Sequence, residues 1–221
     1  MIAIGGTTIT KAYLGQTELA NIAIGDELLF SEESILPEGY VELKYITNNS
    51  SAYIDTGLKT SLLRRIETSL LVPNSSATKI FGSGGSTSGI LYSIRFTAKN
   101  VLGYTTKASF RITSNYDGTT WYNIVFDMKN LICTFNGAEF QMTAPSGGST
   151  YKEYLFAYSQ LGNVNHSYDI KGSMARTRYY EDDILVRDYI PCISPDNIVG
   201  MYDLVNDDFN GHSDFIAGRR K

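Results

Sequence analysis

Short runs of alternating apolar and polar residues fill the chain from about Glu38 onward, and this pattern restricts the fold more than any other feature. The runs include residues 66–72 and 88–96. Two apolar runs, at 122–126 and 131–135, flank the mostly polar tetrad 127–130, which is typical of a hairpin loop. No stretch repeats its apolar positions with a helical period. Short strands separated by turn signals are typical of a sandwich or jelly roll, so we predict an all-β fold.

A ten-residue repeat occupies the N-terminus. Aliphatic–glycine pairs recur as Ile4-Gly5, Leu14-Gly15 and Ile24-Gly25, and a second aliphatic residue follows five positions after each first one. Because glycine adopts the positive φ of tight turns without steric cost, the repeat predicts three short β-hairpins. Hairpins of this size bury little surface alone, so we expect the repeat to be an attachment and oligomerisation module that associates through its aliphatic residues, Ile4, Ile9, Leu14, Leu19, Ile24 and Leu29.

The chain divides after this repeat. Ser31 to Pro37 combines charge, serine and proline and interrupts the periodicity, which indicates a linker. The predicted organisation is therefore a hairpin module at 1–31, a linker at 32–37 and one β-domain at 38–221.

Composition excludes several classes of function. The formal net charge is −4 and the pI is about 5.2, so no basic surface for nucleic acid or an anionic membrane is expected. No apolar run approaches the roughly 20 residues of a membrane helix, and MIAIGGTT lacks the features of a signal peptide. Without such a signal, we expect Cys133 and Cys192 to be buried free thiols rather than a disulfide.

Three segments resemble one family. LPEGYVELKYITNNSSAYIDTGLKT (36–60) is similar to the opening of the concanavalin A-like (laminin G-like) jelly-roll domains of phage and prophage structural proteins, with its Tyr45-Ile46 and Tyr53-Ile54-Asp55-Thr56-Gly57 signature. Residues 184–218 resemble the closing segment of the same family, and Trp121 followed by Phe135-Asn136-Gly137 resembles its middle. The N-terminal hairpins look like the β-repeats that precede such domains in phage tail proteins.

The resemblance implies a concanavalin A-like jelly roll of two antiparallel sheets in a bacteriophage virion protein, made in the host cytoplasm. Such a protein would be a tail or head fibre, decoration or receptor-contacting component. It would be held by residues 1–31 to other virion proteins in a homo-oligomer, with a trimer favoured, and would contact host-surface polysaccharide. A secreted or cell-surface lectin is the alternative, and a glycan hydrolase comes behind it.

The sequence offers no catalytic or cofactor motif. The Glu-x-Asp-x-x-Glu strand of related glucanases is missing, so no catalytic residue is assigned and an enzyme is not expected. Asn206, Asp208 and Asn210, followed by Gly211, match the first half of a calcium loop, but Ala217 stands where the loop needs glutamate. We therefore favour a polar turn there, with calcium as the alternative.

Glycan contact requires an aromatic ring beside polar groups on an exposed rim. The loop residues Tyr116, Asp117 and Tyr151 are the candidates for this role. Trp121 begins an apolar strand and is instead assigned to the core, together with Ile46, Ile54, Val125, Phe135, Val186 and Ile190.

Polar residues within the family motifs have structural interpretations. We expect Asp55 to form an Asx-type turn. The resemblance implies that the late strand lies near the first strands, so that Arg187 would pair with a carboxylate such as Asp55. Asp188 alternates with Val186 and Ile190, so it should point inward and need hydrogen-bond partners, unless a bulge intervenes.

Overall fold

A computed structural model of the chain describes residues 2–4, 7–9, 12–14, 17–19, 21–24, 27–31, 35–73, 78–84, 92–97, 100–105, 108–113, 116–145, 150–160, 163–165 and 171–221. The chain forms two compact units, Met1–Pro37 and Glu38–Lys221. The regular secondary structure of these residues is β-strand, and no helix among them is long and apolar enough to cross a membrane.

The first unit contains the three predicted hairpins. β1 (Ile2–Ile4) pairs with β2 (Thr7–Ile9), β3 (Ala12–Leu14) with β4 (Thr17–Leu19), and β5 (Asn21–Ile24) with β6 (Glu27–Ser31), all antiparallel. Each pair is a separate two-stranded sheet among the described residues. The glycine turns lie outside the described residues. Equivalent aliphatics take equivalent places, because Ile4, Leu14 and Ile24 each end the first strand of a hairpin.

The second unit is a β-sandwich. Its larger sheet has twelve strands with the main order β17-β16-β15-β10-β22-β23-β24-β25, and its smaller sheet has six in the order β14-β13-β12-β11-β19-β20. The bounds of its strands are β7 (Val41–Glu42), β8 (Ile46–Asn48), β9 (Ile54–Lys59), β10 (Arg64–Leu71), β11 (Thr78–Gly84), β12 (Tyr92–Phe96), β13 (Val101–Thr105), β14 (Ala108–Thr113), β15 (Tyr122–Asp127), β16 (Ile132–Phe135), β17 (Ala138–Gln141), β18 (Lys152–Leu155), β19 (Tyr158–Gln160), β20 (Asn163–Asn165), β21 (Gly172–Met174), β22 (Thr177–Glu181), β23 (Ile184–Ile193), β24 (Val199–Asp203), β25 (Asp208–Gly211) and β26 (Phe215–Ala217).

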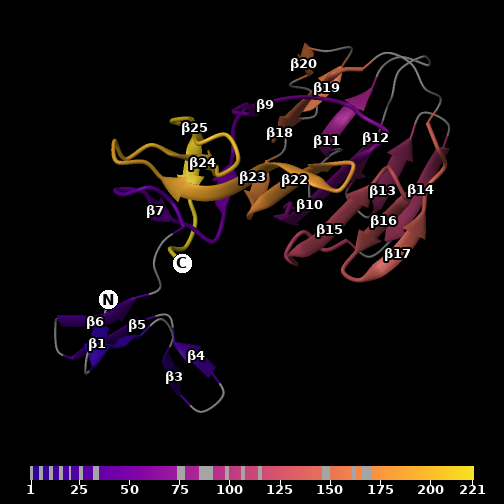
Figure 1. The fold of residues 1–221 in the computed structure, drawn as a ribbon. Coiled ribbons are helices and arrows are strands. Elements are labelled where there is room, and N and C mark those ends of the chain that lie inside the picture. Colours follow the sequence, from indigo (N-terminus) through magenta and orange to yellow (C-terminus); the bar gives the residue numbers. More distant parts are fainter. Residues whose placement is uncertain are drawn as a thin grey trace. The chain divides into compact units, whose positions relative to one another are not determined.

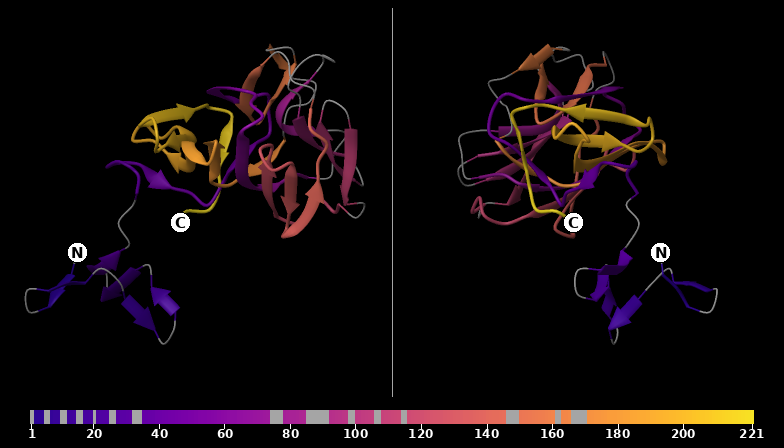
Figure 2. Two further views of the ribbon diagram at one scale, coloured as in Figure 1. Left: turned by 45° about the vertical axis from the view of Figure 1, so that its right-hand side comes forward. Right: turned by 90° about the vertical axis from the view of Figure 1, so that its left-hand side faces the viewer.

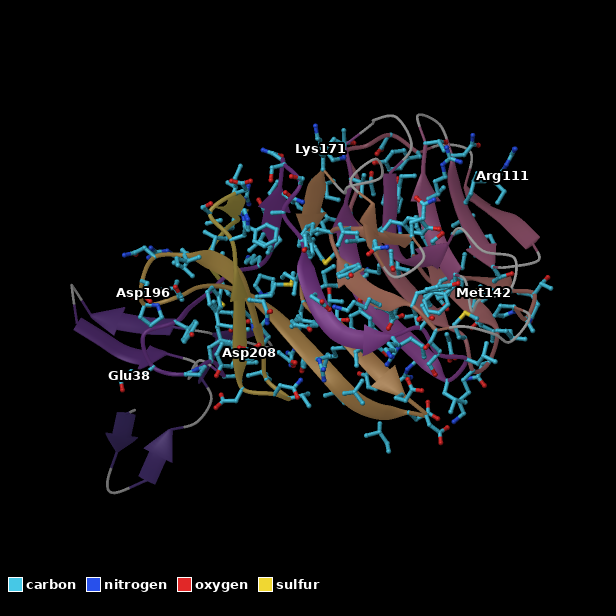
Figure 3. All side chains as sticks on the ribbon, turned by 90° about the horizontal axis from the view of Figure 1, so that it is seen from above. Glu38, Arg111, Met142, Lys171, Asp196 and Asp208 are labelled. Atoms are coloured by element: carbon cyan, nitrogen blue, oxygen red, sulfur yellow. The ribbon has the colours of Figure 1, made fainter. Side chains whose placement is uncertain are left out.

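The predicted fold class, an all-β sandwich of antiparallel sheets preceded by hairpins, is confirmed. One described pair, β11 with β19, is parallel. The long strand β23 leaves the sandwich to pair with β24 and β7 at one end of the domain (Figures 1 and 2). Arg111 and Met142 mark the opposite end from Asp196 and Asp208 (Figure 3).

The core lies between the two sheets. On β10, Ile66, Thr68 and Leu70 are buried while Glu67 and Ser69 between them are partly exposed, which is the period of two expected for a strand with one core face. Ile94 of β12 and Val101 of β13 join the same apolar cluster from the smaller sheet. Cys133 and Cys192 are free and buried, as expected.

The core prediction is right for four residues and wrong for three. Ile46, Ile54, Phe135 and Ile190 are buried, whereas Trp121, Val125 and Val186 are half-buried. Of these three, Val186 still packs against the core cluster. On β15, Tyr122, Ile124 and Phe126 take the core positions, so the alternation is displaced by one residue from the predicted phase. Because side chains alternate across a strand, Trp121 and Val125 lie on the face of the sheet that points away from the core.

A bulge in β23 explains Val186. Tyr179 pairs with Arg187 but Tyr180 pairs with Leu185, so Val186 is an extra residue in its strand. Asp188 is nevertheless buried, and it receives two hydrogen bonds from Arg176, at 2.7 and 2.6 Å. The sequence left an inward Asp188 and a bulge as alternatives, and the structure contains both.

Arg187 pairs with a carboxylate as expected, but the partner is Asp203 and not Asp55. Arg187 donates to the Thr56 carbonyl at 2.9 Å and lies 3.4 Å from Asp203, while Asp55 pairs with Lys152 at 2.8 Å. The Asx turn at Asp55 is confirmed, because the Gly57 amide donates to its carboxylate at 3.0 Å. Gly57 takes a φ of 69°, which glycine adopts without strain.

Candidate ligand-binding surface

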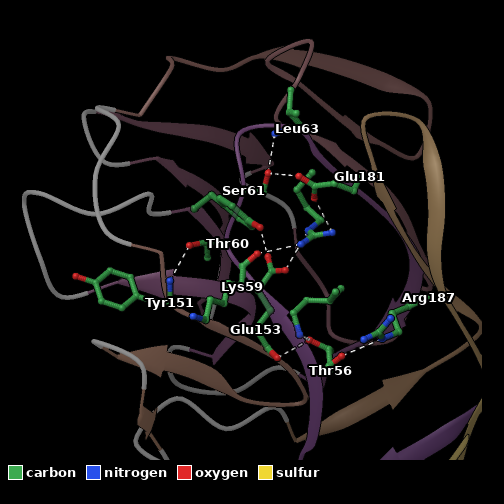
Figure 4. A network of polar contacts seen from close by, with 12 residues as sticks. Thr56, Lys59, Thr60, Ser61, Leu63, Tyr151, Glu153, Glu181 and Arg187 are labelled. Carbon is green, nitrogen blue, oxygen red and sulfur yellow. Dashed lines mark hydrogen bonds and ion pairs between the residues drawn. The ribbon is translucent and has the colours of Figure 1, made fainter. Parts of the chain in front are cut away.

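A buried carboxylate is the most unusual polar group of the interior. Glu153 has no exposed surface, and its carboxylate lies 3.0 Å from Arg64 and accepts a hydrogen bond from the Tyr92 hydroxyl. Arg64 also pairs with Glu181 at 2.9 Å and donates to the Lys59 carbonyl at 2.9 Å (Figure 4). Burial raises the pKa of Glu153 to about 7, against the opposing effect of Arg64. Because the carboxylate is closed to solvent, this network does not meet a substrate.

A local irregularity turns Glu153 inward. The pairing of β18 with β9 changes register between Lys152 and Tyr154, so Glu153 lies at the shift. Irregularities of this kind redirect a side chain.

The outward face of the larger sheet carries a shallow hollow of about 340 Å³. Ser69 of β10 stands opposite Asn123 of β15 and donates a hydrogen bond to its side-chain oxygen. The backbone amide of Asn123 donates in turn to the side-chain oxygen of Asn136, at 2.8 Å. The lining of this hollow combines hydroxyl, amide, carboxylate and guanidinium groups with the apolar Val125. The residues that line it are Glu67, Thr68, Ser69, Asn123, Ile124, Val125, Thr134, Gly137, Arg176 and Arg178.

A second hollow, of about 430 Å³, adjoins the first along the chain. It is lined by Lys44, Tyr45, Trp121, Ala175 and Arg219. Trp121 and Asn123 alternate along the same segment, and Ala175 and Arg176 are consecutive, so neighbouring residues line the two hollows. The rings of Tyr45 and Trp121 lie 5.2 Å apart at a tilt of 55°.

The C-terminal segment builds one wall of this second hollow. Lys44 donates its backbone amide to the Arg219 carbonyl at 2.8 Å, and Gly218 donates to the Tyr45 carbonyl at 3.1 Å. A Cβ at position 218 would lie 2.5 Å from the Tyr45 ring and 2.3 Å from its carbonyl oxygen, so only glycine permits this approach. The sequence could not reveal this site, because Tyr45 and Arg219 lie at opposite ends of the domain sequence.

The structure corrects the predicted setting of Tyr116. Its ring is 5% exposed and packs against Phe96, with 5.0 Å between centroids, so it does not form an exposed platform. Burial raises the pKa of its hydroxyl. The turn signal of the following Asp117-Gly118 suggested an exposed ring at Tyr116. The ring is buried instead, because packing against Phe96 and Tyr122 stabilises the fold more than exposure to water would.

Asp117 and Tyr151 have local structural partners. Asp117 is exposed, and its carboxylate accepts the backbone amides of Thr119 at 2.8 Å and Thr120 at 3.0 Å, which lowers its pKa. Tyr151 is half-buried, and its backbone amide donates to the Thr60 hydroxyl at 3.0 Å. Neither residue lines either of the two hollows.

The half-motif for calcium forms a hydrogen-bonded turn. Asn206 donates to the Asp203 carboxylate at 2.5 Å, and Asn210 donates to Asp208 at 3.3 Å. Within the described ranges, no group of three or more His, Cys, Asp or Glu residues is placed to hold a metal ion. The side chains of the six N-terminal aliphatic residues lie outside the description, so only their strand positions are known.

No protein-family model matches the chain, and no curated protein matches it. Solved structures with a similar fold include the native heptameric SAP-like pentraxin from Limulus polyphemus, at 10% identity and a TM-score of 0.49, over 79% of this chain and 94% of that one. A putative carbohydrate binding protein from Bacteroides ovatus is 11% identical with a TM-score of 0.49, over 88% of this chain and 64% of that one.

Domains LG4-5 of the mouse laminin α1 chain are 10% identical with a TM-score of 0.44, over 86% of this chain and 52% of that one. All three TM-scores are below 0.5. None of the three matches is a phage protein.

Proposed function

We propose that residues 38–221 form a non-catalytic carbohydrate-binding domain. One observation carries the proposal. The half-buried indole of Trp121 lines the second hollow, and the adjoining first hollow is lined by the polar side chains of Ser69, Asn123 and Thr134. Saccharides are recognised by aromatic rings, which stack on the apolar faces of sugars, together with a few fixed hydrogen-bonding groups. Asn123 and Ser69 are fixed in this way by their mutual hydrogen bond.

The carboxylates of this surface argue against hydrolysis. Glycosidases use two carboxyl groups that flank an open site. Among the described residues lining the two hollows, Glu67 is the single carboxylate, and it accepts a hydrogen bond from Tyr180 at 3.3 Å. Asp188 is bound by Arg176, and Glu153 is sealed in the core.

A binding experiment with the full chain tests this function. We expect the protein to bind at least one class of bacterial surface polysaccharide on an array, and Trp121→Ala to lose that binding by about tenfold or more. Tyr53→Ala, which removes another partly exposed ring, is the matched control and should bind normally once both variants are shown to be folded by circular dichroism. Binding that persists in Trp121→Ala, or no binding to any polysaccharide, would overturn the proposal.

We further propose that residues 1–31 attach this domain to a larger assembly. The three hairpins pair within themselves, and an isolated two-stranded hairpin is at best marginally stable in water. Association through Ile4, Ile9, Leu14, Leu19, Ile24 and Leu29 would cover both apolar side chains and open strand edges. The motif resemblance supports a homo-oligomer, with a trimer favoured, in a phage virion, whereas a lectin at a cell surface would use the same binding face.

Truncation separates the module from the domain. Residues 32–221 should remain folded and run as a monomer in sedimentation, while the full chain should form an oligomer. An unchanged mass distribution after truncation would show that the hairpins are not the contact. Mass spectrometry of separated phage heads and tails would test the virion assignment, and absence of the protein from both would favour the cell-surface lectin.

A further inference from the structure

We infer that the hollow lined by Tyr45 and Trp121 binds an acidic saccharide unit, whose carboxylate is held by Lys44 and Arg219. This inference rests on the proposed carbohydrate-binding function and adds the charge of the ligand. It follows from three features of the hollow: two opposed cations, no carboxylate in its lining, and two aromatic rings fixed in place.

The register of the terminal ladder places the two cations face to face. Ile46 pairs with Ala217, and Leu43 forms a bridge with Arg220, both antiparallel. The same register sets Lys44 opposite Arg219, as their backbone hydrogen bond of 2.8 Å confirms. Directly opposed side chains in such a ladder are close neighbours, and like charges there are mutually repulsive. A bound anion relieves this repulsion.

No acidic side chain of the chain's described part neutralises this pair. Neither Lys44 nor Arg219 forms an ion pair with these residues, and both are exposed. Glu42, two positions before Lys44, is instead bound by Lys221 at 2.9 Å. In the adjoining hollow, by contrast, Arg176 and Arg178 lie 2.6 and 3.5 Å from the carboxylate of Asp188. The two hollows therefore differ in charge, and an anion is favoured in the one beside Trp121.

The aromatic walls select among anions. The Tyr45 ring is confined between the backbone of Gly218 and Trp121, so it does not need to be ordered on binding. The exposed part of the Trp121 indole offers stacking area to the apolar side of a sugar ring, which a small inorganic ion cannot use. A guanidinium binds a planar carboxylate through two parallel hydrogen bonds. A hollow of about 430 Å³ has room for a single uronic or sialic acid unit.

The single tryptophan of the chain makes the site directly observable. Trp121 fluorescence of the full-length protein is followed during titration with oligogalacturonate, with its methyl-esterified form, and with sodium sulfate alone. We expect oligogalacturonate to change the emission and the ester to bind about tenfold more weakly or worse. Raising the NaCl concentration from 0.05 to 0.5 M should weaken binding of the acid selectively, because salt screens exposed charges.

Substitutions identify the charges responsible. In the double variant Lys44→Gln, Arg219→Gln, the ratio of the affinities for oligogalacturonate and for its methyl ester should fall close to one. Arg111→Gln, an exposed arginine on β14 at the distant end of the domain (Figure 3), is the matched control and should keep the wild-type preference. A preference that survives the double substitution would contradict the inference.

The outcomes separate the two proposals. Equal, Trp121-dependent binding of acid and ester would overturn the acidic-ligand inference and leave the carbohydrate-binding function standing. An emission change with sulfate that equals the change with the oligosaccharide would reduce the site to a simple anion site and overturn the inference. If neither this ligand nor any other polysaccharide binds, both proposals fail.

Discussion

Glu153→Gln tests the energetic cost of burying a charge in the core of this sandwich. The substitution keeps the length of the side chain, and the amide oxygen still accepts the hydroxyl of Tyr92. It removes the negative charge that Arg64 faces at 3.0 Å. The comparison therefore isolates ionisation from packing.

The magnitude follows from the pKa. Burial raises the pKa of Glu153 from an ordinary 4.5 to about 7, and each tenfold change in an equilibrium is worth about 1.4 kcal/mol. A group whose pKa is higher in the folded state stabilises the fold below its unfolded pKa, and this contribution disappears as the pH rises through the folded value. For Glu153, stability should fall by about 3 kcal/mol between pH 4.5 and 8. Glutamine does not ionise, so the variant should lack this loss.

The assay is urea unfolding of both proteins at intervals from pH 4 to 8.5. We expect the free energy of unfolding of Glu153→Gln to rise by about 3 kcal/mol relative to the wild type across this range. Glu139→Gln, an exposed glutamate on β17, is the control and should follow the wild-type curve. A constant difference would show that Glu153 ionises freely in the fold, and a difference that falls with pH would show that attraction to Arg64 outweighs burial.

Three further predictions concern stability. Arg176→Gln removes the main partner of Asp188, whose side chain is 6% exposed. The substitution should lower the free energy of unfolding by about 3 kcal/mol in urea titrations, and a loss below about 0.5 kcal/mol would contradict the importance of the pair. Gly137→Ala forces a side chain onto a φ of 82° in the Asn136-Gly137 turn and should lower stability by about 1 kcal/mol in thermal unfolding; an unchanged midpoint would argue against this turn geometry. Tyr116→Phe deletes a buried hydroxyl with no hydrogen-bond partner among the described residues and should leave stability equal or up to about 1 kcal/mol higher, whereas a clear loss would reveal a partner.

The sequence by itself determined the class of fold and its local turns. Alternation with a period of two and the absence of helical periodicity required strands, and the ten-residue repeat required three hairpins. Asp55 and Asn136-Gly137 specified their turns because the conformations needed there depend on one or two side chains. These features are local, so neighbouring residues are enough to predict them.

Only the tertiary structure decided which face of each strand is buried and where the candidate site lies. A displacement of one residue on β15 moved Trp121 from the predicted core to the wall of an outward hollow, since every residue on a strand changes face when the phase changes by one. Tyr116 is a core residue in place of a rim residue because its ring packs against Phe96 and Tyr122, which lie on two other segments of the chain. Lys44 and Arg219 face each other because the last residues of the domain pair with some of its first, and sequence periodicity carries no information about a partner strand that lies far along the chain.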